Sequence, residues 1–274
     1  MRKVLIAIAA LCMLAGTACL SFPLVKEYVR SEEDKKKIKE FHRSEVPEEE
    51  DPLYQSFAAY NARILSEGQS GLSDAWSFEQ EQIKNVLPEN DMAGYITIEA
   101  MDISLPLYIG ADEDNLMNGA AVLANTSMPI GGESTNCVIA GHRGGYNGQA
   151  VFRDIEVLSP GDIVSLTNSW ETLEYEVIKS IVIMPDDIDA IKIIPGEDML
   201  TLVTCHPYGE NTQRYVVYCS RCGSEAEERI EIKDGIPFSS SIREIELERN
   251  LYRIGICAAG IVFVLLIVVL VRRK

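Results

Sequence analysis

The chain has 274 residues, of which 47% are hydrophobic and 24% are charged. This balance is typical of a folded protein with room for one core of ordinary size plus appendages. The formal net charge of −17 at pH 7 argues against nucleic acid as a partner, because phosphate backbones are bound by basic surfaces. The acidity fits a protein that faces outward, but it specifies no partner by itself.

The N-terminal region carries the first strongly apolar stretch. After Arg2 and Lys3, residues 4–25 form an apolar run of roughly 20 residues, which is long enough to cross a bilayer as a helix. We interpret residues 1–25 as an N-terminal transmembrane segment or signal anchor, with a cleaved signal peptide as the alternative. A lipoprotein cleavage site at Cys19 is disfavoured because Gly16 stands where a leucine is expected.

A second apolar run covers residues 254–271, and the basic residues 272–274 follow it. Such a uniform run predicts a C-terminal transmembrane helix with a short cytoplasmic tail. Basic residues favour the cytoplasmic side of the membrane, so we expect both termini in the cytoplasm and residues 26–253 outside. The predicted location is therefore the cell membrane, with an extracytoplasmic folded domain.

Two regions precede that domain. Residues 26–67 contain a stretch dominated by charged side chains, which predicts a solvated stalk or exposed helix. Before Gly68 the larger side chains recur at helical spacing and predict an amphipathic helix, with its face at Tyr54, Phe57, Ala58, Asn61, Ile64 and Leu65. Residues 68–93 are polar and irregular. After the domain, residues 224–253 are expected to form a juxtamembrane linker.

The sequence pattern of residues 94–223 is typical of β-strands, with short runs of branched and aromatic residues separated by turn signals. We expect strands at Gly94–Ile98, Ile103–Ile109, Ala120–Leu123, Cys137–Ala140, Ile163–Leu166, Leu173–Met184, Leu200–Thr204 and Tyr215–Tyr218. Short helices are expected at Asp114–Asn118 and Val151–Leu158. The fold class is therefore mainly β, a closed eight-stranded barrel with short helices, preceded by a helix and flanked by two transmembrane helices.

The cysteines outside the apolar runs are Cys137, Cys205, Cys219 and Cys222. The last two form a lone C-x-x-C, a weak signal that leaves open redox chemistry, a structural disulfide or an incidental pair at a strand end. A zinc site would need two further ligands at suitable spacing, and none is evident. We expect neither a metal nor a cofactor.

Only three histidines are available for chemistry. His42 lies in the charged stalk and is expected to be solvated. His142 ends the apolar run CVIAGHRGG, where a strand gives way to a glycine-rich loop. His206 directly follows Cys205 in LVTCHPYG, where another strand ends.

Cys205, His142 and Arg214 together provide what acyl transfer requires. A thiol with a pKa of about 8.5 is mostly protonated at neutral pH and needs a cationic neighbour or a base, either of which an imidazole supplies. The oxyanion that develops during attack can be bound by a guanidinium. The leaving amine needs a proton, and imidazolium is a natural donor.

The strings that hold these residues resemble the signature of the sortase family. TLVTCHPYGENTQRYVVY is similar to the segment in which T-L-x-T-C ends one strand and an arginine opens the next, and CVIAGHRGG is similar to the segment around the family's histidine. The order of His142, Cys205 and Arg214 agrees as well. The resemblance covers roughly residues 94–221, the whole of the expected barrel, and the paired motifs are highly specific.

The resemblance implies a cysteine transpeptidase that cleaves an LPXTG-like sorting signal between Thr and Gly. Cys205 would be the nucleophile, and His142 would protonate the leaving amine and later deprotonate the incoming one. Arg214 would orient the substrate and stabilise the oxyanion, while Thr204 would help to line the site. His206 stands at a variable position of the motif and is expected to be a neighbour, not a catalyst.

Several features resemble the class C, pilin-polymerising branch, which has a second C-terminal span and an N-terminal helix followed by a lid. The resemblance places the lid element at Asp74-Ala75-Trp76, so Asp74 would pair with Arg214 and Trp76 would cover Cys205. Ala75 departs from the pattern, which has a proline there, and this implies a less rigid loop. Asp51-Pro52-Leu53 is not expected to be the lid, because it precedes the helix.

The amine that resolves the acyl-enzyme is left open by the residues. A pilin lysine would give pilus assembly, and the amino group of a cell-wall precursor would give anchoring of surface proteins. L,D-transpeptidases are disfavoured because Leu-Val-Thr precedes Cys205, and papain-like hydrolases because they place Cys before His. A non-enzymatic, doubly anchored surface scaffold would explain the spans but not the pairing of Cys205 with Arg214.

Overall fold

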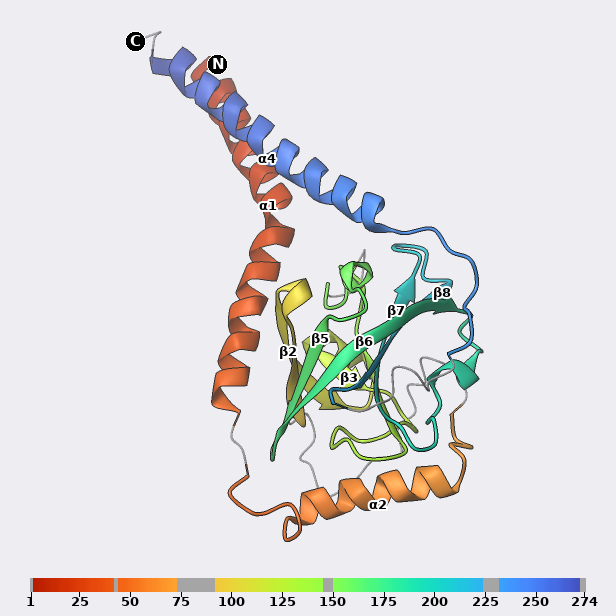
Figure 1. Ribbon diagram of the computed structural model, residues 1–274. Helices are drawn as coiled ribbons and strands as arrows, with labels where there is room; N and C mark the ends of the chain where they lie inside the picture. The colour runs from red at the N-terminus through yellow and green to blue at the C-terminus, as the bar shows by residue number, and fades with distance from the viewer. Residues whose placement is uncertain (1, 42–43, 73–91, 145–149, 224–231, 272–274) are drawn as a thin grey trace. The chain divides into compact units, whose positions relative to one another are not determined.

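The computed structural model describes the chain except for residues 1, 42–43, 73–91, 145–149, 224–231 and 272–274 (Figure 1). The described chain forms two compact units. One contains Met1–Glu33 together with Ile242–Lys274, and the other contains Asp34–Ser241. The second unit holds the barrel and all of the candidate catalytic residues.

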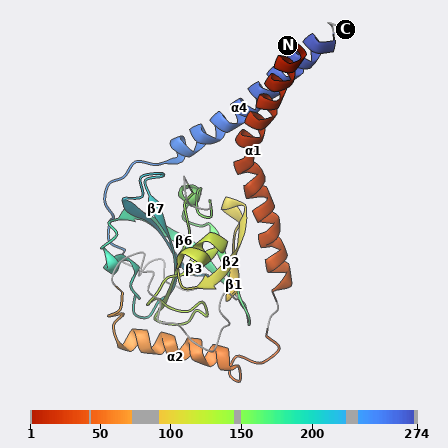
Figure 2. The ribbon, with the colours of Figure 1, turned by 180° about the vertical axis from the view of Figure 1, so that it is seen from behind.

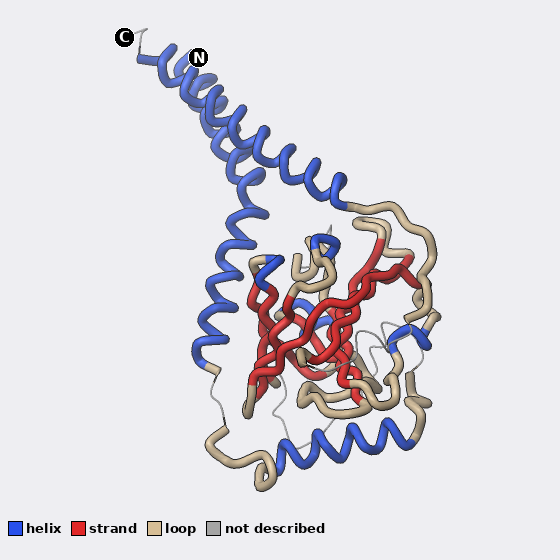
Figure 3. Tube along the Cα trace, in the orientation of Figure 1, coloured by secondary structure: helices blue, strands red, loops and turns tan. Residues whose placement is uncertain are grey.

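The predicted closed eight-stranded barrel is confirmed, and Figure 3 shows its strands in red. The strands run around the barrel in the order β1-β2-β3-β4-β7-β8-β6-β5. Their bounds are β1 Gly94–Ile98, β2 Ile103–Ile109, β3 Ala120–Val122, β4 Thr135–Ala140, β5 Ile163–Asn168, β6 Thr172–Ile183, β7 Asp198–His206 and β8 Gln213–Arg221.

Two of the barrel's neighbouring pairs are parallel, β2 with β3 and β4 with β7, and the other pairs are antiparallel. Strand β7 lies between β4 on one side and β8 on the other. Because β4 and β7 run in the same direction, their C-terminal ends meet at the same end of the barrel. The chain reverses beyond β7, so the start of β8 lies at that end too.

Successive side chains of a strand point to opposite faces of the sheet, and in the site strands both faces carry apolar residues. Inward-facing residues such as Leu202, Ile139 and Val217 belong to a fully buried cluster that fills the barrel. Their neighbours on the opposite face, such as Val203 and Val216, pack in a second cluster with residues that include Leu116 of α3 (Glu113–Asn118). Both faces of the site strands are therefore covered by apolar side chains.

Helix α2 (Pro52–Ser66) confirms the predicted amphipathic helix and lies across one end of the barrel (Figures 1 and 2). Asp51 caps its first turn by accepting a hydrogen bond from the Leu53 backbone N–H at 2.9 Å, and Pro52 occupies the first helical turn, where no N–H donor is needed. The buried face packs against loop residues of the barrel, through Phe57, Tyr60, Ile64, Met128 and Ile130.

The remaining short helices differ from expectation in one place. Helix α3 confirms the helix predicted at 114–118. The helix predicted at 151–158 is wrong, because only the 3-10 turn η2 (Ile155–Val157) forms there. The apolar residues of this segment, such as Phe152 and Ile155, pack into the barrel core, and the Phe152 N–H donates to the His142 carbonyl at 2.8 Å. Two further 3-10 turns, η1 (Glu99–Met101) and η3 (Ile188–Ile191), were not expected.

The other unit contains residues 2–33 of α1 (Arg2–Glu40) and all of α4 (Ile242–Val271), and these two helices lie side by side toward the chain termini in both views of the ribbon (Figures 1 and 2). Helix α1 continues well past the expected end of the span at residue 25 and takes in part of the charged stalk. Within the described residues, one helix, Ile8–Glu40, is long and apolar enough to cross a membrane. The second predicted span, residues 254–271, lies in α4 and is not confirmed as a span.

Candidate active site

Cys205 and Arg214 face each other across the antiparallel pair of β7 and β8. Cys205 is the last residue but one of β7, and Arg214 is the second residue of β8. Directly opposed residues in an antiparallel pair project from the same face of the sheet, with Cβ atoms about 5 Å apart. The fold therefore brings the thiol and the guanidinium together on one face.

His142 reaches the same level from the other side of β7. Strands β4 and β7 are parallel with Ala140 beside Val203, so His142, two residues beyond Ala140, stands level with Cys205. The Gly141 N–H continues the ladder by donating to the Val203 carbonyl at 3.2 Å. Cys205 is thus flanked by the segment that bears His142 and by the strand that bears Arg214.

Gly141 is needed for this placement of His142. A Cβ atom at Gly141 would lie 2.7 Å from Cδ2 of Phe152, a distance that side chains do not tolerate. The close packing continues on the next residue, where the His142 carbonyl accepts the hydrogen bond from the Phe152 N–H. The glycine before the histidine therefore lets the loop sit against the 151–152 segment and fixes the backbone of His142.

Thr204 and His206 lie on either side of Cys205 in the strand and, by alternation, project from the opposite face of β7. Both are completely buried. The Thr204 hydroxyl donates to the Gly141 carbonyl at 2.6 Å, which ties β7 to the backbone immediately before His142. This position gives Thr204 a contact with the backbone that carries the histidine. His206 packs against the rings of Tyr215 and Phe238.

The Arg214 side chain is half-buried and is held by backbone carbonyls at the start of β8 and in the loop before it. Its Nη1 donates to the Asn211 carbonyl at 3.2 Å and to the Gln213 carbonyl at 3.0 Å. A guanidinium has five N–H donors in a fixed planar arrangement, so these bonds orient the group.

Among the barrel cysteines, Cys205 has the surroundings that a reactive thiol requires. Burial raises the pKa of the Cys205 thiol, and the positive charges of Arg214 and Arg143 oppose that rise. Burial also raises the pKa values of Cys137 and Cys219, which lie in the barrel interior without such cations. Cys205 is half-buried and therefore combines access with cationic neighbours.

The pair Cys219 and Cys222 does not form a disulfide; both are free thiols. Cys219 faces the core, whereas Cys222 follows the end of β8 and is partly exposed. Burial first, and then the nearby carboxylates Glu174 and Glu176, raise the pKa of Cys222. Within the described parts of the chain, no group of three or more His, Cys, Asp or Glu side chains is arranged to hold a metal ion.

The predicted lid residues, Asp74 and Trp76, lie outside the described residues. The other Asp-Pro element has a clear structural role, because the Asp51 carboxylate accepts hydrogen bonds from Ser44 at 2.7 Å and from Trp170 Nε1 at 3.0 Å in addition to its capping bond. Asp51 therefore fastens the start of α2 to the loop that follows β5.

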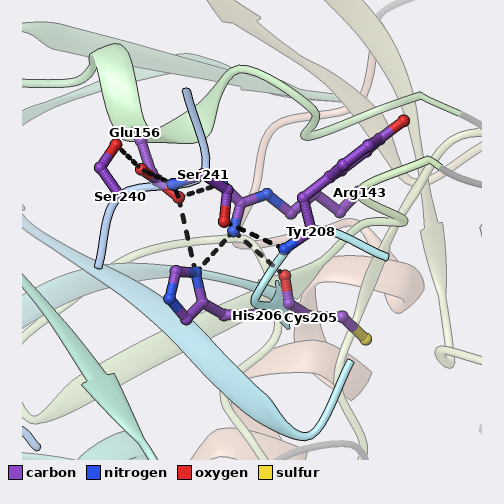
Figure 4. A network of polar contacts seen from close by, with 7 residues as sticks. All are labelled: Arg143, Glu156, Cys205, His206, Tyr208, Ser240 and Ser241. Atoms are coloured by element: carbon purple, nitrogen blue, oxygen red, sulfur yellow. Dashed lines mark hydrogen bonds and ion pairs between the residues drawn. The ribbon is translucent and has the colours of Figure 1, made fainter. Parts of the chain in front are cut away.

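Sequence reasoning missed Arg143 and Glu156, which form a buried ion pair next to the site (Figure 4). The Arg143 Nη1 also donates to the carbonyl oxygen of Cys205 at 3.3 Å. Arg143 adjoins His142 in the chain, and that position could have drawn attention to it. Glu156 sits between apolar residues of a turn, and no spacing in the sequence links it to the site.

The comparisons with known proteins agree with this geometry. A family model described as "Sortase domain" matches residues 96–222. Sortase A of Bacillus anthracis is 30% identical over 158 residues, covering 56% of this chain and 73% of its own length.

Solved structures match as well, and those that the chain resembles are mostly class C sortases. A pilus-related Sortase C of Group B Streptococcus aligns with a TM-score of 0.60 at 27% identity, covering 71% of this chain and 98% of that one. A Clostridium perfringens sortase C, determined with the C-terminal cell wall sorting motif, aligns with a TM-score of 0.56 at 37% identity, covering 66% and 93%.

The sortase domain and the sortases that the chain resembles show that it is a cysteine transpeptidase. The chain belongs to the sortase family.

Proposed function

We propose that Cys205, His142 and Arg214 catalyse transpeptidation at an LPXTG-like sorting signal. The observation that carries this proposal is the placement of Cys205 at the end of β7, directly opposite Arg214 and level with His142. A nucleophile, an oxyanion ligand and a proton carrier then come from three adjacent segments. Thr204, on the opposite face of β7, stabilises the arrangement by donating a hydrogen bond to the Gly141 carbonyl.

The reaction proceeds in two acyl transfers. The Cys205 thiolate attacks the Thr carbonyl carbon, and the Arg214 guanidinium stabilises the oxyanion of the tetrahedral intermediate. As the Thr–Gly bond breaks, His142 gives its proton to the leaving amine, and a thioester to Cys205 remains. An incoming amine then attacks the thioester, His142 takes up its proton, and a new amide forms as the thiolate leaves.

We infer that the incoming amine is a lysine of a pilin subunit. This is supported by the likeness to class C structures, one of which is described as pilus-related. A solved sortase C that carries the C-terminal cell wall sorting motif supports the choice of that signal as the acyl donor. The second candidate is anchoring of surface proteins to the wall, which is favoured by the sequence similarity to a Sortase A.

We further propose that α4 forms a second membrane span, with both termini in the cytoplasm and the barrel outside the cell. Residues 254–271 of α4 are apolar, and large side chains such as Ile254, Ile261 and Leu265 are more than half exposed in the structure. A helix whose apolar side chains point outward needs an apolar surrounding, and a bilayer provides one.

The proposed function is tested by presenting the full-length chain, in detergent, with a sorting-signal peptide and two competing amines. One amine is a pilin fragment with a lysine, and the other is a peptide that carries the amino group of the wall precursor. We expect a lysine isopeptide product with the wild-type chain and none with Cys205→Ala. If a product forms with the wall amine alone, the function is anchoring of surface proteins and not pilus assembly. Cleavage of the sorting signal by Cys205→Ala would refute the mechanism.

A further inference from the structure

Behind the candidate nucleophile lies a cluster of three buried polar side chains, Arg143, Glu156 and His206 (Figure 4). The side chains of Arg143 and Glu156 are 1% and 3% exposed, and that of His206 is completely buried. Fully buried arginine and glutamate are rare in proteins unless they are paired. The assigned roles of Cys205, His142 and Arg214 make no use of this cluster.

Arg143 is the centre of the cluster. Its guanidinium forms the ion pair with Glu156, donates to the Cys205 carbonyl oxygen at 3.3 Å, and lies 2.8 Å from His206 Nδ1. Arginine is always protonated and can only donate, so Nδ1 of His206 accepts this hydrogen bond. One guanidinium thus binds a carboxylate, an imidazole and the backbone of the nucleophile at once.

Glu156 connects the cluster to the segment 232–241, which we call the C-terminal strap. The carboxylate accepts hydrogen bonds from the Ser241 N–H, at 3.0 Å to Oε2, and from the Ser240 hydroxyl. Burial would raise the pKa of Glu156, but the hydrogen bonds from Ser240 and Arg143, together with the positive charge of Arg143, lower it to about 2. Glu156 is therefore an anion at neutral pH, held between the strap and Arg143.

The strap is fastened to the barrel along its length. The Ile236 N–H donates to the Val182 carbonyl at 2.8 Å, and Lys179 donates to the Ile232 carbonyl at 2.9 Å. Phe238 lies edge-on to His206, with ring centroids 5.3 Å apart. At its end, the Ser241 hydroxyl accepts a hydrogen bond from the Tyr208 N–H at 3.0 Å, in the loop that joins β7 to β8.

We propose that Arg143 is a positioning residue for the transpeptidation, oriented by Glu156 and the C-terminal strap so that it fixes the backbone of Cys205 and His142. The proposal rests on Cys205 being the nucleophile, as inferred above. Arg143 touches the Cys205 carbonyl and follows His142 in the chain, so a change in its orientation moves both residues. In the same geometry it adds a second positive charge near the thiol, besides that of Arg214.

Stability alone does not account for this cluster. Burying two opposite charges costs most of what their attraction returns, and well-packed apolar residues are often as stable. A buried pair is useful where a fixed geometry is required, and here the pair adjoins the backbone of two proposed catalytic residues. The strap, which leads directly into α4, then becomes part of the active-site framework and not only a linker.

The test uses the full-length chain in detergent and three readouts. The first is the pH midpoint of iodoacetamide alkylation at Cys205, measured on the peptide that contains it. The second is kcat and KM with a sorting-signal peptide, and the third is the folded fraction from circular dichroism. The variants are Arg143→Gln, Arg143→Lys, Glu156→Gln, Ser240→Ala and the double change Arg143→Gln/Glu156→Gln.

Arg143→Gln is expected to raise the alkylation midpoint and to lower kcat about a hundredfold with little change in KM, because the nucleophile is misplaced and a cation is lost. Arg143→Lys should keep the midpoint near the wild-type value but still lower kcat, since one ammonium cannot span three acceptors. Glu156→Gln should lower kcat, and the double variant should be no worse than Arg143→Gln. Ser240→Ala should lower kcat about threefold.

Three results would overturn the proposal. The first is a wild-type kcat and alkylation midpoint in the folded fraction of Arg143→Gln, which would leave Arg143 a purely structural role. The second is additive losses in the double variant, which would mean that Glu156 does not act through Arg143. The third is an unchanged kcat in Ser240→Ala, which would mean that the C-terminal strap has no part in positioning the active site. The double variant leaves no unpaired buried charge, so it keeps the test available if a single variant does not fold.

Arg221→Gln is the matched control, because Arg221 lies at the far end of β8 and is paired with Asp198 at 4.0 Å. It should leave both kcat and the alkylation midpoint unchanged. Alkylation needs no substrate, so a wild-type chain that fails to cleave the sorting peptide would refute the proposed function while the midpoints still test the role of Arg143.

Discussion

Cys205 and Arg214 are directly opposed in the antiparallel ladder of β7 and β8, so backbone pairing sets the separation of their Cβ atoms. No loop has to close to bring the thiol and the guanidinium together. Preorganised groups of this kind lower a reaction barrier without reorganisation during the reaction. His142, which lies beyond the end of β4, depends instead on Gly141 and on the contacts of a short loop.

Replacing Arg214 by Lys separates charge from directed hydrogen bonding. The lysine keeps the positive charge near Cys205 but lacks the planar fork that binds an oxyanion. We expect kcat/KM for a sorting-signal peptide to fall about 10²–10³-fold with little change in thermal unfolding. The comparison is with Arg221→Lys, which should retain activity. Near-wild-type kcat/KM in Arg214→Lys would mean that charge alone is needed.

Glu156 makes the stability of the barrel unit sensitive to acid. Its folded pKa of about 2 lies below the ordinary value of 4.5, so the stabilisation is fully present above about pH 4.5. It is lost as the pH falls from 4.5 towards 2. We expect Glu156→Gln to lower the free energy of unfolding by about 3 kcal/mol at pH 7, because Arg143 is left buried without its anion.

The pH dependence distinguishes this account from a general loss of packing. Urea unfolding at pH 7 and pH 3 should show a smaller difference in Glu156→Gln than in the wild type. Glu174→Gln, on the exposed face of β6, serves as the control and should behave as the wild type does. An equal pH dependence in all three chains would contradict the assignment of the acid-sensitive stability to Glu156.

Asp51 is expected to contribute to stability and not to catalysis. Asp51→Ala removes the cap of α2 together with the bonds from Ser44 and Trp170. We expect a loss of about 2 kcal/mol in the free energy of unfolding, measured by urea titration, with kcat unchanged in the folded protein. A large fall in kcat without loss of stability would instead give Asp51 a role at the site.

The predicted lid leads to a separate test. If Trp76 covers Cys205 and Asp74 pairs with Arg214, then Trp76→Ala raises the rate of thiol labelling at Cys205 in the full-length chain. The rate is measured with iodoacetamide on the peptide that contains Cys205, and Trp170→Ala provides an aromatic control on the barrel. Equal labelling rates in wild type and Trp76→Ala would count against a closed lid.

Much of the barrel could be predicted from the sequence because its strands alternate clearly between turn signals. The bounds of β1 and β2 agree with the prediction to the residue. Strand β7 is longer than predicted because its ends, Asp198 and His206, are polar residues whose burial depends on partners far away in the chain. The helix predicted at 151–158 failed for a related reason, since its apolar residues pack into the barrel core while only the 3-10 turn η2 forms.

The three proposed catalytic residues could be chosen from the sequence because each belongs to a specific motif at a strand end. The Arg143–Glu156 pair could not, because its members belong to no shared motif and meet only when the loop after β4 and the turn η2 pack together. The hydrogen bonds from Ser240 and Ser241 to Glu156 could not be predicted either, because they join distant parts of the chain that share no sequence motif. Tertiary packing alone defines that network.

The formation of a thioester between Cys205 and the sorting signal is tested most directly by mass spectrometry of the peptides from the trapped acyl-enzyme. The full-length chain is incubated with a sorting-signal peptide, quenched in acid and digested, and the modified cysteine is identified. We expect the acyl group on Cys205 alone, and its disappearance in Cys205→Ala but not in Cys222→Ala. An acyl group on another cysteine, or its persistence in Cys205→Ala, would contradict the account.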